Sequence, residues 1–196
     1  MTQSVDGPRA RYRQQVRDEV QTRAWTQISL DGVSALSLKA IATAMGLTAP
    51  ALYRYYKSRD ELLTELIVSA YADLAELVEA AALRSDTSAG RLSAIGNALR
   101  EWAVEHPQRY LLLYGTPVPG YHAPDTATAL AQRIFAPIMA GFDEEPGAGG
   151  LPRSLTWWTR LHGVLSLELA GHFIGMKVDP AQHFQAELRS AINIAG

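Results

Sequence analysis

The chain has 196 residues, no cysteine and a formal net charge of −2 at pH 7. This length suits one domain, or a small module joined to a larger one, and the absence of cysteine excludes disulfides and thiolate chemistry. The N-terminus lacks the apolar core of a signal peptide, and no apolar run reaches the roughly 18 residues of a membrane span. We therefore expect a soluble, cytoplasmic protein that has no membrane contact.

The net charge hides an asymmetry between the two ends of the chain. Residues 1–59 hold nine Lys and Arg against four acids, a net charge of +5, whereas the remainder holds nine against sixteen, a net charge of −7. A basic end joined to an acidic body is typical of a protein in which one module faces a polyanion. The alternative is a chance cluster of solvated charges.

Alanine and leucine dominate the composition, and no run of alternating apolar and polar residues predicts a strand. We therefore expect an all-α fold of about nine helices. Residues 1–8 read as a disordered arm that closes on Gly7-Pro8. A helix is predicted from Arg9 to near Asp31-Gly32, and its buried stripe is expected to be Val16, Val20, Ala24 and Ile28.

Two short helices joined by a tight turn are predicted within residues 36–63. Ser37 is the expected N-cap of the first helix, which Gly46 ends. Thr48 is the expected N-cap of the second, whose body is predicted over residues 51–55. Two short helices around a glycine-containing turn make a helix-turn-helix, whose second helix lies in the DNA major groove.

Six further helices are predicted after this motif. Ser58 is the expected N-cap of a long helix that reaches about Leu83. Pro137 is expected to bend a later helix, and residues 143–152 read as a flexible linker. The remaining helices are predicted over residues 89–105, 108–114, 125–142, 154–176 and 181–194.

In a helix-turn-helix, side chains near the start of the second helix reach base edges, and neighbouring polar groups contact phosphates. Small residues at 49–51 allow a close approach to thymine methyl groups, and Arg54 has the fork that recognises guanine. Tyr53 and Lys57 suit phosphate contacts. The candidate DNA-binding residues are Ser37, Lys39, Thr48, Ala49, Pro50, Ala51, Tyr53, Arg54, Tyr55 and Lys57.

The same stretch carries a specific pattern of residues: Ser37, Ile41-Ala42, Ala44-Met45-Gly46, Leu52-Tyr53, Tyr55-Tyr56, Lys57 and Asp60-Glu61-Leu62-Leu63. This pattern resembles the N-terminal signature of the tetracycline-repressor (TetR) family of one-component transcription regulators, with Tyr56 where the family often has Phe. The resemblance implies a DNA-binding domain over residues 1–57 and a ligand-binding and dimerisation domain over residues 58–196. Residues 58–83 would be the connecting helix.

The resemblance also implies a homodimer in which the helices at 154–176 and 181–194 pair across a two-fold axis. The local sequence supports a close helix approach, because small and apolar residues form a stripe along the first of these helices: Gly163, Leu167, Ala170, Gly171 and Ile174. Within the same helix, residues 158–163 resemble the Trp, His, Gly pattern of one C-terminal subgroup of the family.

Aromatic and soft side chains gather in the segments that, by the resemblance, line a ligand cavity. Two interpretations stay open: an ordinary packed core, or a cavity for a flat or hydrophobic molecule with a few polar groups. The candidate effector-binding residues are Trp102, Tyr110, Tyr114, Phe135, Met139, Trp158, Arg160 and His162.

His162 and His172 do not indicate a metal or catalytic site, because no second pair of metal ligands accompanies them. Glu168 and His172 are spaced four residues apart on one predicted helix, which favours a surface contact or a hydrogen bond in a dimer. The sequence has no nucleophile elbow, phosphate loop or dinucleotide fingerprint. We therefore expect no enzymatic activity, no cofactor and no metal.

The sequence thus predicts a ligand-responsive transcriptional regulator. The main hypothesis is a repressor that a small hydrophobic or aromatic effector releases from a palindromic operator in double-stranded DNA. One alternative is a transcriptional activator or a regulator that works without a ligand. Another is a helical protein that binds small molecules and has no role at DNA.

Overall fold

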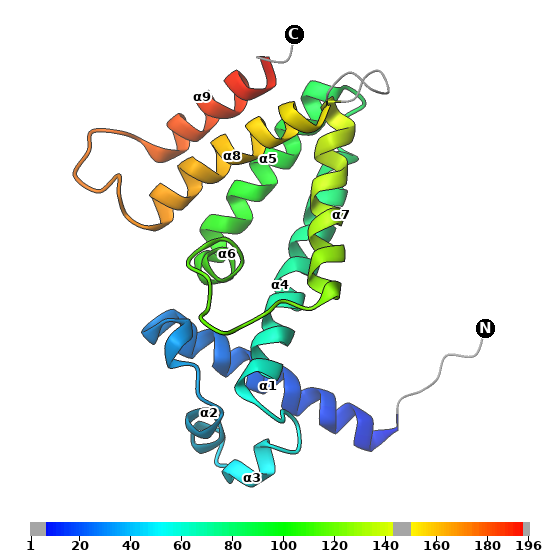
Figure 1. Ribbon diagram of the computed structural model, residues 1–196, viewed down its shortest axis with the longest axis vertical. Coiled ribbons are helices and arrows are strands. Elements are labelled where there is room, and N and C mark those ends of the chain that lie inside the picture. The colour runs from blue at the N-terminus through cyan, green and yellow to red at the C-terminus, as the bar shows by residue number, and fades with distance from the viewer. Residues whose placement is uncertain (1–6, 143–149, 194–196) are drawn as a thin grey trace. The chain divides into compact units, whose positions relative to one another are not determined.

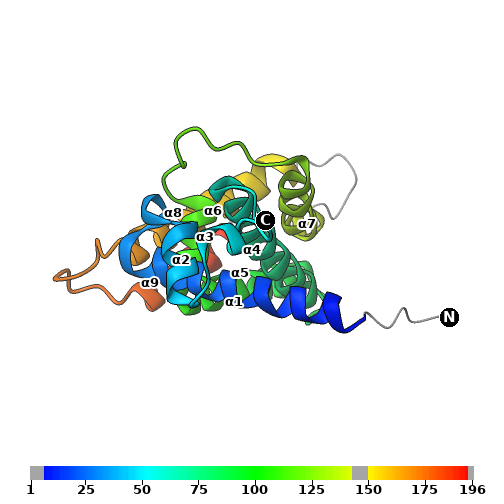
Figure 2. The same cartoon turned by 90° about the horizontal axis from the view of Figure 1, so that it is seen from below.

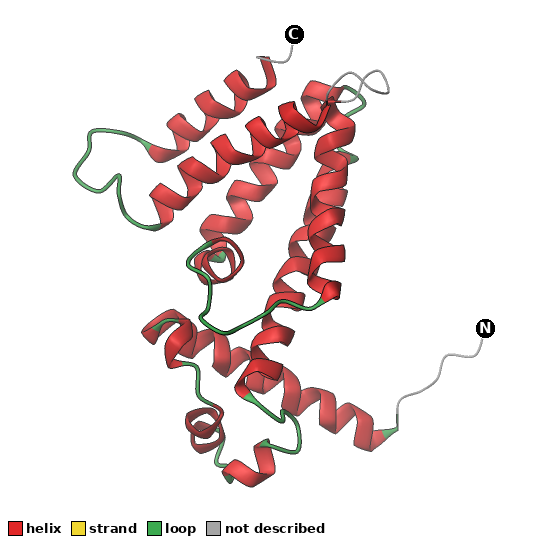
Figure 3. Ribbon diagram, viewed as in Figure 1, coloured by secondary structure: helices red, strands yellow, loops and turns green. Residues whose placement is uncertain are grey.

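The computed structural model describes residues 7–142 and 150–193. These residues form nine α-helices and one short 3-10 helix, and no strand is found among them (Figure 3). The predicted all-α fold is therefore confirmed. Contacts divide the chain into two compact units, one of residues 1–67 with 117–122 and one of residues 68–116 with 123–196. None of the helices in the described ranges combines the length and the apolar character that a membrane crossing needs.

The first unit is built on a long N-terminal helix. This helix, α1, buries the predicted stripe of Val16, Val20, Ala24 and Ile28. The elements of the unit are α1 (Pro8–Asp31), the 3-10 helix η1 (Val33–Ala35), α2 (Leu38–Ala44), α3 (Ala49–Leu52) and the first part of α4 (Arg59–Ala82) (Figure 2). Each predicted helix start in this unit coincides with a cap or a proline, as the residue preferences of helix ends require.

The second unit surrounds one continuous apolar core. The core includes large side chains from every helix of the unit, among them Leu74, Trp102, Tyr110, Phe142, Trp157 and Phe184. The elements are the second part of α4, α5 (Ser88–Glu105), α6 (Pro107–Tyr114), α7 (Asp125–Phe142), α8 (Gly150–Leu169) and α9 (Pro180–Asn193). Helices α8 and α9 lie side by side, and α7 packs against α5 and α8 (Figure 1).

The recognition-type helix α3 begins directly after its predicted N-cap, Thr48, but ends three residues before its predicted end. The prediction was residues 51–55, whereas α3 spans Ala49–Leu52. The predicted cap is confirmed, because the Thr48 hydroxyl accepts a hydrogen bond from the backbone N–H of Ala51 at 3.3 Å. Tyr53 and Tyr55 instead belong to a turn, in which the N–H of Tyr55 donates to the carbonyl of Leu52.

The predicted end of α8 is wrong by seven residues, because the helix stops at Leu169 and not at Met176. Gly171 has a φ of +77°, which ends the helix in a left-handed residue. Its N–H donates to the carbonyl of Glu168, and the N–H of His172 donates to Leu167, as in a Schellman cap. Gly171 therefore terminates α8 and does not extend its stripe of small residues.

The predicted linker over residues 143–152 is corrected only in part. Residues 143–149 lie outside the described residues. Gly150, Leu151 and Pro152 form the first turn of α8. Proline is tolerated there, since the first N–H groups of a helix have no partner within the helix.

Candidate functional site

Helices α2 and α3 form a helix-turn-helix whose ends are capped by the predicted residues. The Ser37 hydroxyl accepts a hydrogen bond from the N–H of Ala40 at 3.4 Å, and Thr48 caps α3 in the same way. Between them, Gly46 has a φ of +67°, a conformation that other residues adopt at a cost. The chain therefore turns sharply between two short helices, as the sequence predicts.

The face of this motif that surrounds α3 is exposed. Lys39, Thr48, Pro50, Tyr53, Arg54 and Lys57 are exposed, while Ser37, Ala49, Ala51 and Tyr55 are half-buried. The side chain of Leu52, on the opposite side of α3, is fully buried. The structure thus brings the candidate DNA-binding residues together on one motif, with an apolar anchor beneath them. The Ser37 hydroxyl, however, is already engaged as the cap of α2.

A polar network holds the segment that follows α3. Arg17 of α1 donates hydrogen bonds to the carbonyl of Tyr55, at 3.0 Å, and to the Glu65 carboxylate of α4. Glu65 also accepts from the Tyr56 hydroxyl at 3.0 Å and from the Gln21 side chain. Burial, and then the charge of Glu65, raise the pKa of Tyr56, so that its hydroxyl stays protonated and donates. Residues 53–57, which we call the recognition segment, are therefore fixed to both α1 and α4.

Arg59 serves the fold of the motif. Its guanidinium group donates to the carbonyl of Val33 at 2.7 Å and to the carbonyl of Leu36 at 3.1 Å. These carbonyls lie just before α2, so Arg59 ties the start of α4 to the entry of the helix-turn-helix. The sequence counts Arg17 and Arg59 in the basic end, but the structure uses both of them for internal contacts.

The second unit contains a pocket of about 370 Å³. Helices α4, α6, α7 and α8 line it with Tyr71, Tyr114, Thr128, Ala131, Gln132, Ile134, Phe135, Leu155 and Trp158. Its aromatic rings meet edge to face, with centroids 5.8 Å apart for Tyr114 and Trp158 and 6.0 Å apart for Phe135 and Trp158. None of these lining residues carries a formal charge. The volume lies within the range of small-molecule sites in proteins.

A neutral histidine stands next to this pocket. The His162 ring lies 3.9 Å from the Trp158 ring and 4.5 Å from the Tyr114 ring, measured between centroids. Its Nδ1 atom is 2.8 Å from the Tyr110 hydroxyl, which is also 3.2 Å from the Ser166 hydroxyl. Burial lowers the pKa of His162 to about 3, so the imidazole is uncharged at neutral pH. Its buried Nε2 atom has no hydrogen-bond partner within the described ranges.

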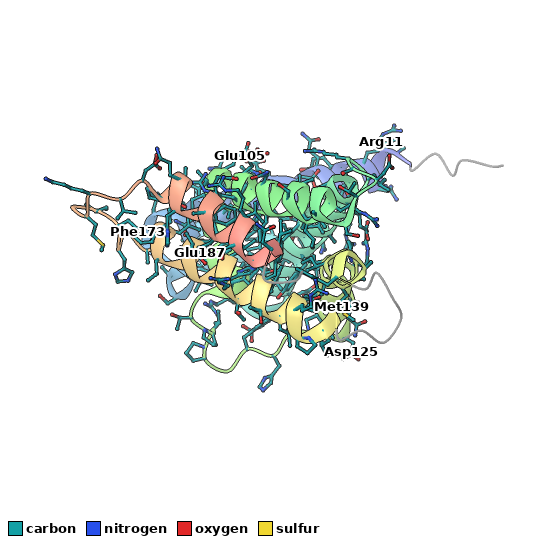
Figure 4. The ribbon with its side chains drawn as sticks, turned by 90° about the horizontal axis from the view of Figure 1, so that it is seen from above. Arg11, Glu105, Asp125, Met139, Phe173 and Glu187 are labelled. Atoms are coloured by element: carbon teal, nitrogen blue, oxygen red, sulfur yellow. The ribbon has the colours of Figure 1, made fainter. Side chains whose placement is uncertain are left out.

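The eight candidate effector-binding residues occupy three different environments. Tyr114, Phe135 and Trp158 line the pocket, and Tyr110 and His162 lie behind it. Trp102 belongs to the core, 6.2 Å from the His106 ring between centroids. Met139, labelled in Figure 4, is half-buried on α7. It is not one of the residues that line the pocket.

Arg160 and Glu168 make contacts between helices instead of facing the pocket. Arg160 pairs at 3.0 Å with Glu187, which lies on α9 next to α8 (Figure 4). Glu168 pairs at 2.6 Å with Arg100 of α5. The predicted surface contact between Glu168 and His172 on one helix is wrong, because α8 ends before His172.

Six lining residues are absent from the prediction: Tyr71, Thr128, Ala131, Gln132, Ile134 and Leu155. A signal for part of this set exists on α7, where residues 128, 131, 132 and 135 share one helix face at spacings of three and four. Thr128 and Gln132 are polar and share this face with Phe135, whereas a helix face that packs in a core is normally apolar. Among residues 7–142 and 150–193, no cluster of three or more His, Asp or Glu side chains could hold a metal ion.

Family models match both parts of the chain. The model for bacterial regulatory proteins of the tetR family matches residues 22–66, which include the whole helix-turn-helix. The model for the tetracyclin repressor-like C-terminal domain matches residues 92–191. The second match contains α6, α7 and α8, three of the four helices that line the pocket.

Several proteins are similar to this chain over most of its length. The HTH-type transcriptional regulator Rv1816 of Mycobacterium tuberculosis is 36% identical, over 96% of this chain and 95% of its own length. The crystal structure of the regulatory protein SCO4313 is 46% identical, with a TM-score of 0.87, over 95% of this chain and 100% of that one. FadR of Bacillus subtilis, solved in complex with stearoyl-CoA, is 11% identical with a TM-score of 0.71, over 89% and 97%, and shows the shared fold alone. From these matches, the chain belongs to the TetR family of DNA-binding transcriptional regulators.

Proposed function

We propose that this protein is a homodimeric repressor that leaves a near-palindromic operator when a small, uncharged, largely apolar or aromatic molecule occupies the pocket of the second unit. The observation that carries the proposal is the pocket itself, which is roomy, aromatic and lined without charge next to a neutral histidine. In this proposal residues 1–57 bind DNA, and residues 58–196 bind the effector and dimerise.

The exposed face around α3 supports the role in DNA reading. Arg54 would recognise guanine through its bidentate guanidinium group, and Tyr53 and Lys57 would contact phosphates. The small side chains at 49–51 would bring the backbone close to the base edges. Because Arg54 is the one strong base reader in this set, close fit and DNA shape would supply much of the remaining specificity.

The chemistry of the lining supports an uncharged effector. A charged ligand in this pocket would lose hydration without gaining an opposite charge from the lining residues, which is costly in an apolar site. Thr128 and Gln132 offer neutral hydrogen-bonding groups, and burial raises the pKa of Tyr71 and of Tyr114, which keeps both hydroxyls protonated. A flat molecule with one or two neutral polar groups matches this combination.

An exposed stripe on α8 supports the proposed dimer through α8 and α9. Leu151, Leu155, Thr159, Gly163 and Leu167 are all exposed and follow one another at a spacing of four. A Cβ atom added at Gly163 would meet nothing within 4 Å, so a second helix could approach closely there. Gly163→Leu should therefore lower the dimerisation affinity, and sedimentation velocity measures it. A variant that dimerises as well as the native chain would overturn this interface.

Two DNA heads in a dimer would read successive major grooves about 34–36 Å apart. Helix α4 carries both Glu65, which holds the recognition segment, and Tyr71, which lines the pocket. An effector that prefers a different placement of α4 would therefore change the separation of the heads. This is how occupancy of the pocket would reach the DNA.

The test measures DNA affinity with and without effector. A duplex selected from random DNA serves as the operator, and a panel of uncharged aromatic compounds is screened by the quenching of tryptophan fluorescence, because Trp158 lines the pocket. The proposal expects a compound that quenches fluorescence and weakens operator binding at least tenfold. Equal affinities across all quenching compounds would overturn ligand release, and a tighter complex with ligand would instead establish a co-repressor or an activator.

A filled pocket provides the matched control. Ala131→Phe places a ring in the pocket, whereas Ala136→Phe adds the same ring at an exposed position of the same helix. The first variant should bind operator. The compound should neither quench its tryptophan fluorescence nor release it from the operator. The second should behave as the native chain does. If both variants respond alike, the effector binds elsewhere.

A further inference from the structure

The first two turns of α1 project from the first unit without packing against it. Residues 8–15 are all exposed, and Val16 is the first buried residue of the helix. Figures 1 and 2 show no other helix of this unit beside these turns. Three arginines, Arg9, Arg11 and Arg13, occupy them, and none of the three makes an ion pair or a hydrogen bond in the described part of the chain.

These arginines oppose the intrinsic stability of the helix that carries them. The N-terminus of a helix has a partial positive charge, so cations in the first turns are unfavourable and acids are preferred. No acidic residue stands in the first turn of α1, and its N-cap Gly7 provides no side-chain cap. Residues that break a preference of this kind without stabilising the fold are expected at functional sites.

The later arginines of the same helix differ sharply from this group. Arg17 contacts Glu65 and the carbonyl of Tyr55, and Arg23 pairs with Glu19 at 3.0 Å. The fold therefore neutralises the basic residues of α1 after Val16 and leaves those before it without an acidic partner in the described residues. The uncompensated charge is confined to the projecting end.

Arg9 and Arg13 lie on the helix face that leads to the recognition segment. Spacings of four place Arg9, Arg13 and Arg17 in one line along α1. Arg17 is the member of this line that holds Tyr55, just after α3. Arg11 sits on the opposite side of the same turns, and Figure 4 marks its position.

We propose that Arg9 and Arg13 form a second DNA-binding site, which contacts the phosphate backbone beside the major groove that α3 enters. The site takes phosphate groups of duplex DNA, recognises charge and not base identity, and fixes the register of the head. Its ligand is the same duplex DNA that the exposed face around α3 binds in the proposed function, on which this inference rests. Arg11 faces away from this backbone.

The salt dependence of DNA binding tests the site. Each phosphate contact contributes about 0.9 to the slope of log affinity against log salt. Arg9→Gln with Arg13→Gln should reduce this slope by about two. The ratio of native to variant DNA affinity should therefore fall roughly tenfold between 50 and 200 mM salt. The deficit should be the same for a random-sequence duplex and for a selected operator. Fluorescence anisotropy with labelled duplexes measures both.

Two variants serve as controls. Arg11→Gln removes the same charge from the opposite face and should leave the slope unchanged, whereas Arg9→Lys with Arg13→Lys keeps both charges and should retain the native slope. Glutamine is a good helix former at these exposed positions, so thermal unfolding should be unaffected.

Three outcomes would overturn the proposal. In the first, the double glutamine variant keeps the native slope. In the second, Arg11→Gln loses half as much slope as the double glutamine variant, which reduces the effect to net charge. In the third, the double variant binds DNA normally but loses binding to phosphatidylserine vesicles, which assigns the arginines to a membrane surface instead. Because DNA binding by α3 can persist in each case, failure here is distinguishable from failure of the proposed repressor.

Discussion

The hydroxyl groups of Tyr121 and Thr64 lie 3.1 Å apart, within hydrogen-bonding distance, in the first unit. Tyr121 belongs to the loop of residues 117–122, which follows α6 and precedes α7 in the chain. Both of these helices line the pocket, whereas Thr64 lies on the part of α4 that belongs to the unit of the helix-turn-helix. The loop therefore connects α6 and α7, two helices that line the pocket, along the chain to the DNA-binding unit.

Tyr121→Phe removes this hydrogen bond and keeps the ring. We expect the free energy of unfolding to fall by about 1 kcal/mol, because one partly buried hydrogen bond is lost. We also expect a smaller ratio between operator affinities measured without and with the quenching compound, since the loop is held less firmly. Tyr12→Phe, at an exposed tyrosine of α1, is the control. An unchanged ratio for Tyr121→Phe would show that this loop does not carry the effect of the compound to the DNA-binding unit.

The Glu65 carboxylate joins three donors from two elements, and its loss should loosen the recognition segment. Glu65→Gln removes the charge that Arg17 and the Tyr56 hydroxyl contact, and charge-assisted bonds of this kind contribute about 1.5–3 kcal/mol. We expect a lower free energy of unfolding for the first unit and weaker binding to every duplex. Urea titration and anisotropy measure the two effects, and Glu105→Gln, at an exposed site, should change neither. Native DNA affinity together with lowered stability would show that the network does not position α3.

Local sequence was sufficient to predict the helix-turn-helix, because caps, glycine turns and apolar spacing act between residues that are close in the chain. Ser37, Gly46 and Thr48 all act where they were expected. The end of α8 was missed because Gly171 fits two local interpretations, a packing residue or a C-cap, and only the observed φ distinguishes them.

The pocket could be predicted only in part, because its walls come from helices far apart in the sequence. Aromatic content identified Tyr114, Phe135 and Trp158, but composition does not tell which side chains meet. Arg160 was grouped with them, yet its partner Glu187 lies on the next helix, and no periodicity reveals such a pair. Residue type alone likewise could not separate the exposed Arg54 from Arg59, which is used inside the fold.

The difference between these two arginines gives a direct test of the interface. Arg54→Ala should weaken binding to a selected operator about tenfold to a hundredfold, as expected for the loss of a bidentate base contact, and should leave the melting temperature unchanged. Arg59→Ala should lower the melting temperature, because it leaves the carbonyls of Val33 and Leu36 without their donor. Anisotropy and thermal unfolding separate the two. If Arg54→Ala loses affinity equally for selected and random duplexes, Arg54 contacts phosphate and not a base.

The buried imidazole of His162 should make the stability of the second unit depend on pH. The unfolded imidazole binds a proton near pH 6.5, whereas burial lowers the pKa of the folded one to about 3. Between these values the unfolded state holds more protons, so stability is complete above pH 6.5 and is lost as the pH falls. From pH 7.5 to 5.0 this one group should remove about 2 kcal/mol from the free energy of unfolding.

His162→Gln has no such proton, so its stability should fall less than that of the native chain over this interval. His122→Gln, at an exposed histidine, should follow the native curve. Urea titrations at the two pH values measure all three proteins, and parallel losses for the native chain and His162→Gln would mean that the imidazole is accessible to protons in the folded state.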